Sequence, residues 1–419
     1  MDLQLTAPRR VDATIALPTS KSISNRILLI AALCGNEPHV LHPALCDDTA
    51  VMVEALSRQD CGTINVGAAG TAMRFLTAYF ATREGVTVTL DGTDRMRQRP
   101  IGVLVDALRS LGAHIDYLGE TGYPPLLIHG TLMHGGDVEM SGGVSSQFIS
   151  AVMMILPAIG GGTIRLKGDI VSLPYIHMTA AVMREMGTDV SVRDHAITVG
   201  NGYVGNDYIV EADWSAAAPW YALAALLPGS SLRLEGLSPD SIQGDAHLVE
   251  LGRKLGIETR FDAKGAMLDT SHFIGCCCSC FADMSATPDL ALSWAVLLCL
   301  LERSFRMTGV RTLRFKESDR IDALREELMK LGYVLKIESE DAISWYGERV
   351  AVRQHPPVID THDDHRIAMA FAPAAVRFPG ITIADAETVS KSYPSYWRHL
   401  EQAGFVLVRS EKLGVRSEK

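Results

Sequence analysis

The sequence predicts an α/β protein of two domains, in which sheets surround a core of helices. Three observations lead to this prediction. The chain has 419 residues, which is too many for one simple hydrophobic core. A phrase made of a helical run, a glycine and then alternating apolar residues recurs along the chain. Between these phrases lie other helical segments that are apolar nearly all round.

The recurring phrase places a glycine where each helix should stop and a strand should follow. Its clear copies, roughly 70–75 residues apart, are centred on Gly112, Gly187, Gly256, Gly332 and Gly404. That period is long for a solenoid, and it suits a unit of two helices and several strands that is used about five or six times. Cys61-Gly62 is interpreted as a further, degenerate copy.

The apolar helical segments have no polar face, and a helix of this kind is buried. These segments are residues 147–156, 216–227, 290–301 and 367–376. Each unit is therefore expected to contain one amphipathic outer helix and one inner helix, with strands between them.

The domain junction is expected where a glycine-rich stretch ends and Asp213 opens a new unit. We place the two crossings between domains at residues 19–21 and 210–214. The domains predicted in this way are an inserted domain of residues 20–212 and a discontinuous domain of residues 1–19 plus 213–419.

Composition and charge exclude several classes of function. The sequence is 47% hydrophobic and 21% charged, as in ordinary globular proteins, and its net charge is −10. Nucleic acid and anionic membranes are therefore not expected as partners. The longest apolar runs are shorter than a bilayer requires, and the first residues lack the pattern of a signal or transit peptide. We expect a soluble, cytoplasmic protein.

The cysteines raise the question of a metal site, because Cys276-Cys277-Cys278-Ser279-Cys280 is so dense. Adjacent cysteines on a strand point to opposite faces, however, and no second pair follows at a zinc-like spacing. A strand of small residues with free thiols, in a reducing compartment, is the preferred interpretation.

Chemistry is first indicated around residues 19–33. Thr19 and Ser20 are natural N-caps for the apolar helical run that follows them. The first turn nevertheless carries Lys21 and Arg26, which have the wrong sign for the positive end of a helix dipole and should each cost about 0.3–1 kcal/mol. An anion held by the free backbone N–H groups and by both cations would offset that cost. A solvated basic turn is the alternative.

The same arrangement recurs at other predicted helix starts, which carry an arginine in the first turn or a lysine close by. These residues are Arg74, Arg320, Arg366, Lys316 and Lys391. Because so many helix starts carry a cation, we expect several helix N-termini to converge on one anionic ligand. A guanidinium group can bind two oxygens of a carboxylate or a phosphate at once. No nucleotide-binding glycine motif is present.

Polar side chains at further helix starts extend the candidate site. Arg99 is held beside a helix start by Pro100. Ser145-Ser146-Gln147, and Ser172 together with Tyr175, offer groups suited to a polyol or a phosphate ester. Helix capping alone would also explain the serines.

Two carboxylates could do acid–base work. Asp289 precedes a buried helix whose dipole would keep it ionised, and it could be a cap only or a general base. Glu317 lies among cations, and a salt-bridged surface turn is the alternative to a catalytic role. His362 and the stretch Asp363-Asp364-His365-Arg366 could suggest a metal, but one loop would supply all its ligands. Aspartate caps followed by a His-Arg pair are preferred.

Taken together, these stretches resemble the enolpyruvyl transferases, specifically the 5-enolpyruvylshikimate-3-phosphate synthase family. The resemblance runs, in the family's order and approximate spacing, through residues 17–22, 69–74, 99–101, 145–147, 316–320 and 364–366. It implies two similar domains, each built of three βαβαββ units with buried inner helices (an inside-out α/β barrel), and a cleft that closes on substrate.

The activity that the resemblance implies is transfer of the enolpyruvyl group of phosphoenolpyruvate to the 5-hydroxyl of shikimate 3-phosphate. Phosphate would leave from a tetrahedral intermediate, on the pathway to chorismate and the aromatic amino acids. The resemblance implies no metal and no organic cofactor. The expected partners are these two small substrates, and we expect a monomer.

The resemblance also implies roles for single residues. Phosphoenolpyruvate would be bound by Lys21, Gly70, Arg99, Arg320, Arg366 and Lys391. Shikimate 3-phosphate would be bound by Lys21, Ser22, Arg26, Ser145, Ser146, Gln147, Ser172, Tyr175, Asp289 and Lys316. Asp289 resembles the base that takes the 5-hydroxyl proton, and Glu317 and Lys21 resemble the acid–base pair at the phosphoenolpyruvate carbons.

Two alternatives remain open at this point. The related UDP-N-acetylglucosamine enolpyruvyl transferase has a Lys-Asn pair and a catalytic cysteine in a mobile loop, whereas this chain has Lys21-Ser22 and no cysteine in residues 95–99. An inactive paralogue that only binds phospho-metabolites would not need Asp289 and Glu317 together. The sequence also departs from the family at Ala68, where Asn is usual, and at Phe75, where Pro is usual.

Overall fold

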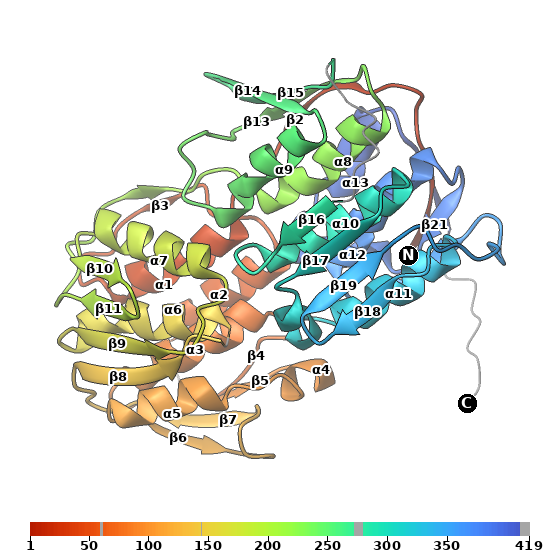
Figure 1. The fold of residues 1–419 in the computed structure, drawn as a ribbon. Helices are drawn as coiled ribbons and strands as arrows, with labels where there is room; N and C mark the ends of the chain where they lie inside the picture. The colour runs from red at the N-terminus through yellow and green to blue at the C-terminus, as the bar shows by residue number, and fades with distance from the viewer. Residues whose placement is uncertain (59–61, 144, 272–279, 411–419) are drawn as a thin grey trace.

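The buried apolar side chains gather in two separate clusters. The protein is described here by a computed structural model, which covers residues 1–58, 62–143, 145–271 and 280–410. One cluster comes from residues 23–210, and the other from residues 3–15 together with 212–405. In Figure 1 the first cluster corresponds to the lobe that carries α1 to α7, and the second to the lobe that carries α8 to α13.

In its described residues, the lobe of residues 23–210 contains two four-stranded sheets and one two-stranded sheet. The first sheet, ordered β4-β5-β7-β6, comprises β4 (Gly62–Asn65), β5 (Thr87–Asp91), β6 (His114–Tyr117) and β7 (Leu126–His129). The second, ordered β8-β9-β11-β10, comprises β8 (Gly136–Ser141), β9 (Gly162–Lys167), β10 (Val190–Arg193) and β11 (Ala196–Val199). The third pairs β3 (Val40–Leu41) with β12 (Tyr208–Ile209). The helices are α1 (Lys21–Leu33), α2 (Asp47–Ser57), α3 (Gly70–Ala81), α4 (Asp94–Arg97), α5 (Gly102–Ser110), α6 (Ser146–Ile155) and α7 (Leu173–Glu185).

The described part of the other lobe contains three four-stranded sheets. They are ordered β2-β13-β15-β14, β16-β17-β19-β18 and β20-β21-β1-β22. Their strands are β1 (Asp2–Thr6), β2 (Asp12–Ala16), β13 (Ser231–Glu235), β14 (Glu258–Asp262), β15 (Gly265–Asp269), β16 (Cys280–Asp283), β17 (Phe305–Thr308), β18 (Lys336–Ser339), β19 (Ala342–Trp345), β20 (Val358–Ile359), β21 (Ile381–Ile383) and β22 (Val406–Ser410). The helices are α8 (Ala218–Leu226), α9 (Leu248–Lys254), α10 (Ala291–Leu300), α11 (Arg320–Lys330), α12 (His365–Phe371) and α13 (Tyr396–Gln402).

All the four-stranded sheets share one topology. The first two strands are parallel, and the remaining strands pair antiparallel, as β4, β5, β7 and β6 do. This is the predicted βαβαββ unit. The strand β1 begins the chain but completes the last unit, between β21 and β22, so both ends of the chain close one sheet.

One unit differs from the expectation of three complete copies in each domain. Around α1 and α2 the described residues form only the parallel pair β3 and β12. The degenerate copy predicted at Cys61-Gly62 belongs here, although Cys61 lies outside the described residues. Gly62 begins β4, which is the first strand of the following unit. In the described part of the chain, the unit of α1 and α2 has no closing hairpin of its own before β4.

The repeat glycines behave as predicted. Each has a φ between +83° and +99°, and each follows an outer helix and precedes a strand. The residue after the glycine donates its N–H back to the last helical turn, as Tyr333 N does to Leu328 O at 2.9 Å. This is a Schellman motif, which ends the helix and turns the chain into the sheet.

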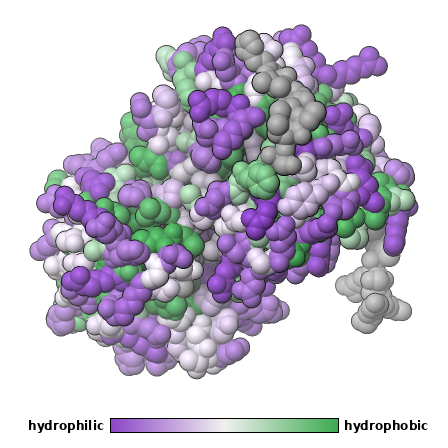
Figure 2. All heavy atoms as spheres, viewed as in Figure 1, coloured by the Kyte–Doolittle hydropathy of each residue, from purple (hydrophilic) through white to green (hydrophobic). Residues whose placement is uncertain are grey.

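The predicted inner helices are buried as expected. Every residue of α8 is buried, and so is every residue of α6 except Gln147. The sheets lie outside them, so the face in Figure 2 is mostly hydrophilic, with smaller apolar areas between. No helix in the described residues is long and apolar enough to cross a membrane. Of the predicted cysteine strand, residues 276–279 lie outside the described residues, and Cys280 begins β16.

The chain crosses between the two lobes twice, and the crossings pair with each other. Thr19 and Ala212 form an isolated antiparallel bridge. Ser20 N donates to Glu211 O and Asp213 N donates to Pro18 O, both at 2.8 Å. The paired crossings hold the N-terminus of α1, and hence Lys21, at the seam between the lobes.

Two repeat glycines give a matched test of the fold. Gly332→Ala should destabilise the protein more than Gly404→Ala. Both have similar φ values, +86° and +91°, so both substitutions should carry the cost of a left-handed alanine, about 1–2 kcal/mol. A Cβ at Gly332 would also lie 2.8 Å from the carbonyl oxygen of Val350, whereas one at Gly404 meets only Pro8 Cβ at 3.5 Å. Urea unfolding of the two variants would measure the difference, and equal midpoints would contradict it.

Candidate active site

A cavity of about 500 Å³ lies between the two lobes and is lined from both sides. The structure brings to it all but two of the residues to which the resemblance assigns a binding or catalytic role. Those at the cavity are Lys21, Ser22, Arg26, Arg99, Ser145, Ser146, Gln147, Ser172, Tyr175, Asp289, Lys316, Glu317, Arg320 and Arg366. The two that do not line it are Gly70 and Lys391.

Helix starts position most of these side chains. The starts of α1, α6 and α7 face the cavity from one lobe, and the segments that lead into α10, α11 and α12 face it from the other. Side-chain caps stabilise several of them: Ser20 accepts from Ile23 N at 3.4 Å, and Asp364 accepts from Arg366 N at 2.9 Å. The positive ends of several helix dipoles therefore point toward one space.

Two of the arginines lie one turn deeper than the sequence analysis placed them. Arg26 is in the second turn of α1, which begins directly after its predicted cap Ser20. Arg74 is in the second turn of α3, which begins at Gly70, earlier than expected. Helical side chains lean toward the N-terminus, and so both guanidinium groups still reach back. Arg26 donates to the carbonyl of Ser22 at 2.8 Å, and Arg74 to that of Gly70 at 3.3 Å.

The three arginines of residues 23–210 that line the cavity, Arg26, Arg74 and Arg99, are buried without a carboxylate ion pair among the described residues. Arg26 donates to Thr179 Oγ1 at 2.7 Å, and Arg74 to the carbonyl of Pro100 at 3.1 Å. Arg99 donates to the carbonyl of Ala68 at 3.4 Å, and its Nε has no hydrogen-bond partner. Burial lowers the pKa of Arg26 to about 10, and it lowers the pKa of Arg99 as well. Buried positive charge of this kind is stabilised by a bound anion.

On the opposite side, one buried arginine joins three carboxylates. Arg320 lies with its Nε 2.7 Å from Asp364, its Nη1 2.7 Å from Asp289 and its Nη2 2.8 Å from Glu317. Asp289 also lies 3.4 Å from Lys316 and 3.3 Å from Arg366. The charged side chains on this wall of the cavity, which residues 289–366 form, are therefore paired with one another. The arginines on the facing wall, which residues 23–210 form, have no such ion pairs in the described structure.

Both candidate catalytic carboxylates are held ionised. Burial alone would raise the pKa of Asp289, but Arg366, Lys316 and Arg320 outweigh it and hold the pKa well below its usual range. Burial likewise opposes ionisation of Glu317, and Arg320 and Arg99 outweigh it. Each carboxylate can therefore accept a proton.

Lys21 is in the opposite charge state. Burial would lower its pKa, but the carboxylate of Asp48, 2.7 Å from Nζ, outweighs burial and raises it. His365 beside it is neutral, because burial and then the charge of Lys21 lower its pKa well below the usual range. Lys21 is thus a proton donor at a cavity where Asp289 and Glu317 are proton acceptors.

Two carboxylates, Asp48 and Asp245, contact Lys21 and Tyr175 without having been predicted from the sequence. Asp48 lies in the first turn of α2, where its place is fully explained by the helix dipole. Asp245 accepts from Tyr175 Oη at 3.4 Å and from Ser215 Oγ. No local pattern signals these contacts, which join residues 27 and 70 positions apart.

Gly70 and Lys391 do not line the cavity, and their contacts show where each lies instead. A Cβ on Gly70 would lie 2.4 Å from Arg99 Nη2, so the glycine makes room for that guanidinium. Lys391 ends a short helical turn rather than preceding α13 directly, and its Nζ donates to the carbonyl of Asp363 at 2.6 Å. Lys391 is therefore outside the cavity in this conformation.

The loop of residues 362–366 does not gather its side chains around one point. Both oxygens of Asp364 bond Arg320, and His362 Nε2 lies 2.8 Å from Glu327 Oε1. This geometry favours the cap interpretation of the loop.

The two walls touch at the rim of the cavity. Arg95 Nη2 donates to the carbonyl of Arg314 at 3.1 Å, and Ser172 N donates to the carbonyl of Ser285 at 2.9 Å. These contacts partly close the cavity. A closed cavity suits a reaction in which water would otherwise compete with the substrate.

Comparison with known proteins gives a consistent result. A family model described as EPSP synthase (3-phosphoshikimate 1-carboxyvinyltransferase) matches residues 5–59 and 59–400. The 3-phosphoshikimate 1-carboxyvinyltransferase of Bacteroides fragilis is 46% identical over 405 residues, which cover 96% of this chain and 97% of the relative. The protein of that name from Syntrophobacter fumaroxidans is 36% identical, with 94% and 97% covered.

Solved structures show the same fold. The EPSP synthase of Acinetobacter baumannii aligns with a TM-score of 0.73 at 22% identity, covering 97% of this chain and 100% of the other. The enolpyruvyl transferase NikO from Streptomyces tendae aligns with a TM-score of 0.73 at 14% identity, covering 97% and 98%. At these identities the likeness concerns the fold alone, and it confirms the predicted enolpyruvyl transferase architecture.

The unequal charge compensation of the two walls predicts unequal effects on stability. Arg320→Met should lower the free energy of unfolding at pH 7 by about 3–5 kcal/mol, because it leaves buried carboxylates uncompensated. Arg26→Met should cost less than about 2 kcal/mol, because only neutral acceptors lose a partner and Ser150 and Thr179 still bond each other.

Urea unfolding at several pH values would measure both effects. The carboxylates have lowered pKa values in the folded state, so the stability from Arg320 is present above about pH 4 and is lost as pH falls further. The deficit of Arg320→Met should therefore shrink toward low pH. A deficit equal to that of Arg26→Met at pH 7 would contradict this account of the two walls.

Proposed function

The chain belongs to the EPSP synthase (3-phosphoshikimate 1-carboxyvinyltransferase) family, and we propose that the cavity between its lobes performs that reaction with Asp289, Glu317 and Lys21 as the acid–base groups. The protein acts in the shikimate pathway: it transfers the enolpyruvyl group of phosphoenolpyruvate to the 5-hydroxyl of shikimate 3-phosphate and releases phosphate. The observation that carries the assignment of residues is the ionised Asp289 among three cations at the cavity.

The binding of shikimate 3-phosphate is proposed to use the wall of residues 23–210. Buried Arg26, with no carboxylate partner among the described residues, supports a phosphate site there, and hydroxyl and amide groups around it suit a polyol. The proposed residues are Lys21, Ser22, Arg26, Ser145, Ser146, Gln147, Ser172, Tyr175, Asp289 and Lys316.

Phosphoenolpyruvate is proposed to bind where the two walls meet. Its carboxylate and phosphate would compete with the protein's own carboxylates for Arg320 and Arg366, and would complete the partners of Arg99. Lys21 adds positive charge at the cavity, and Gly70 leaves room for Arg99. Lys391 would add its charge only after a movement from its present contact with Asp363. Arg74 joins this set as a buried cation at the cavity that the sequence analysis noted without giving it a ligand.

The charge states suggest an order of proton transfers. Protonated Lys21 gives a proton to the methylene carbon of phosphoenolpyruvate, while the 5-hydroxyl attacks the neighbouring carbon and Asp289 takes its proton. In the elimination, Glu317 takes a proton from the new methyl group and phosphate leaves with the electrons of its carbon–oxygen bond. The arginines stabilise the charge of the intermediate and of the leaving phosphate.

The two alternatives lose support on separate grounds. UDP-N-acetylglucosamine transfer requires a loop cysteine that residues 95–99 lack, and the matching family and relatives are of the shikimate 3-phosphate enzyme. A binding-only paralogue has no need for Lys21 and Glu317 to hold opposite charge states at one cavity.

We propose further that the two hydrophobic clusters act as two domains. Residues 1–19 plus 213–419 would form one and residues 20–212 the other, with the paired crossings at 19–21 and 210–214 as the hinge. Closure about this hinge would bring the two substrates together and exclude water. We propose a monomer that acts in the cytoplasm on two small substrates.

The reaction and its base can be tested by phosphate release. Purified protein should release phosphate from phosphoenolpyruvate only when shikimate 3-phosphate is present. Asp289→Asn should lower turnover at least about 100-fold, because it removes the base while nearly preserving shape. Asp240→Asn changes an exposed carboxylate that does not line the cavity, and it should leave turnover unchanged.

Each other result has a definite meaning. Release with UDP-N-acetylglucosamine instead would assign the chain to the related activity. Binding of shikimate 3-phosphate without any release would favour the binding-only paralogue. Near-native turnover in Asp289→Asn would remove Asp289 from the role of base.

Lys391 gives a separate test of closure. If it joins the phosphoenolpyruvate site only in the closed form, Lys391→Met should raise the KM for phosphoenolpyruvate about 10-fold, because a charged hydrogen bond is lost. The KM for shikimate 3-phosphate should stay unchanged. Lys264→Met, on an exposed hairpin, is the matched control. Equal KM values for wild type and Lys391→Met would leave Lys391 outside the site.

A further inference from the structure

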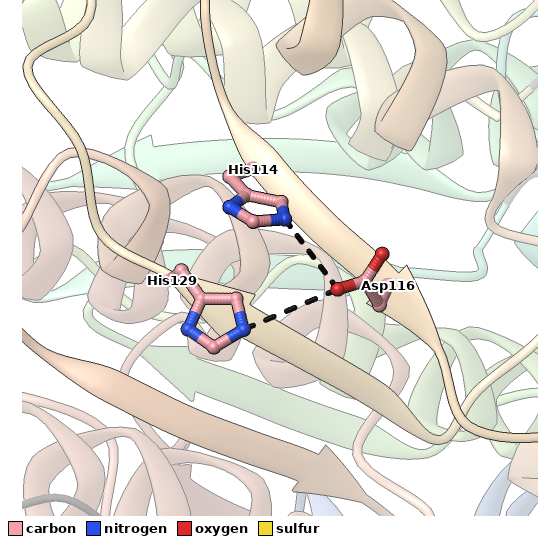
Figure 3. Close-up of side chains that lie close together, drawn as sticks. All are labelled: His114, Asp116 and His129. Carbon is pink, nitrogen blue, oxygen red and sulfur yellow. Dashed lines mark ion pairs between the residues drawn. The ribbon is translucent and has the colours of Figure 1, made fainter.

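Two histidines and one aspartate meet on the outer face of the sheet β4-β5-β7-β6 (Figure 3). His114 and His129 face each other across the antiparallel pair β6 and β7. Asp116 is two residues beyond His114, so its side chain stands on the same face. Ile115 between them is buried in the core, which leaves the three polar side chains on the solvent side. None of the three lines the cavity.

The potential ligand atoms are already close to the spacing of a metal site. Asp116 Oδ2 lies 3.5 Å from His114 Nε2 and 4.0 Å from His129 Nε2, and the three ligand atoms are all within 4.8 Å of one another. Zinc binds nitrogen and oxygen at about 2.0–2.2 Å, so tetrahedral ligands lie about 3.3–3.6 Å apart. Small side-chain rotations would bring all three atoms to one ion.

A hydrogen bond outside the cluster orients one of the rings. His129 Nδ1 lies 3.2 Å from the hydroxyl of Thr87, which is its direct neighbour on β5. When Nδ1–H donates to this hydroxyl, Nε2 carries the lone pair and faces Asp116. Metal-bound histidines are typically held in this way by a partner on the other ring nitrogen.

No lysine or arginine of the described residues neutralises the carboxylate of Asp116, so a bound cation could do so. Within the described residues, the ion pairs of Asp116 are with the two histidines alone, and no lysine or arginine lies within ion-pair distance of it. The other comparable group in the described residues is Glu326, Glu327 and His362. There Lys330 Nζ already lies 2.7 Å from Glu327, so an ammonium group occupies the position that an ion would need.

We propose that His114, Asp116 and His129 bind one divalent transition-metal ion, with Zn²⁺ as the best match. Two imidazoles and one carboxylate are ligands that zinc accepts, and the exposed position leaves water as the fourth ligand. Softer ions that prefer thiolates are disfavoured by this ligand set.

The ion would stabilise the hairpin of β6 and β7 rather than take part in the reaction. The loop of this hairpin contains Gly122, whose carbonyl accepts the N–H groups of Ile101 at 2.8 Å and Gly102 at 3.1 Å. These residues begin α5 directly after Arg99 and Pro100. A metal that ties β6 to β7 would therefore support the segment that holds Arg99 in place.

Zinc binding to the full chain tests the proposal. Protein made without a polyhistidine tag and freed of metal by chelation should bind one Zn²⁺ in calorimetry and unfold at a higher temperature when Zn²⁺ is present. His114→Gln and His129→Gln should each lose this equivalent and the thermal shift. His195→Gln, which changes an exposed histidine on the hairpin of β10 and β11, should keep both.

A cobalt spectrum and one further variant distinguish this site from binding by cysteine thiols. Binding of Co²⁺ should give a spectrum without thiolate charge-transfer bands. Thr87→Val should weaken zinc binding about 10-fold or more without abolishing it, because it removes the partner that orients His129. Equal zinc binding by wild type and both histidine variants would place the ion elsewhere, and absence of binding by wild type would also overturn the proposal.

Discussion

The cluster around Arg320 is the interaction on which the functional wall depends. Its guanidinium group lies against carboxylates that precede α10, α11 and α12, so one side chain joins the starts of three helices from two of the repeated units. Removing such charges from water is expensive, and only near-complete hydrogen bonding makes the burial tolerable. That requirement fixes Asp289, Glu317 and Asp364 in position before any substrate arrives.

The facing wall, formed by residues 23–210, has an excess of positive charge. Arg26, Arg74 and Arg99 are buried, and in the described structure they bond neutral groups and form no ion pair with a carboxylate. The protein therefore holds positive charge there in spite of a net charge of −10. A phosphate or carboxylate ligand supplies the missing partners, and binding then also stabilises the fold. Substrate recognition and closure of the two walls are therefore parts of one electrostatic balance.

Local sequence signals predicted the repeated unit and most of the cavity. The glycines, the helices without a polar face and the cations at helix starts each follow from backbone geometry or dipole sign, which a single segment contains. The two-residue strands β3 and β12 are too short to show a period. The pairing of Lys21 with Asp48, and of Tyr175 with Asp245, depends on how distant segments pack, and no single segment carries that information.

The repeated unit explains why the chemistry lies where it does. Inner helices such as α8 and α10 are buried on all sides, so their flanks have no room for ligands. Their N-terminal ends are the parts that reach the seam, and there unpaired N–H groups and the dipole favour anions. The outer sheet faces carry no such requirement, because His114 and Asp116 are exposed to solvent while Ile115 between them packs in the core. Catalysis is thus confined to helix ends, and additional sites can arise on the sheets without disturbing it.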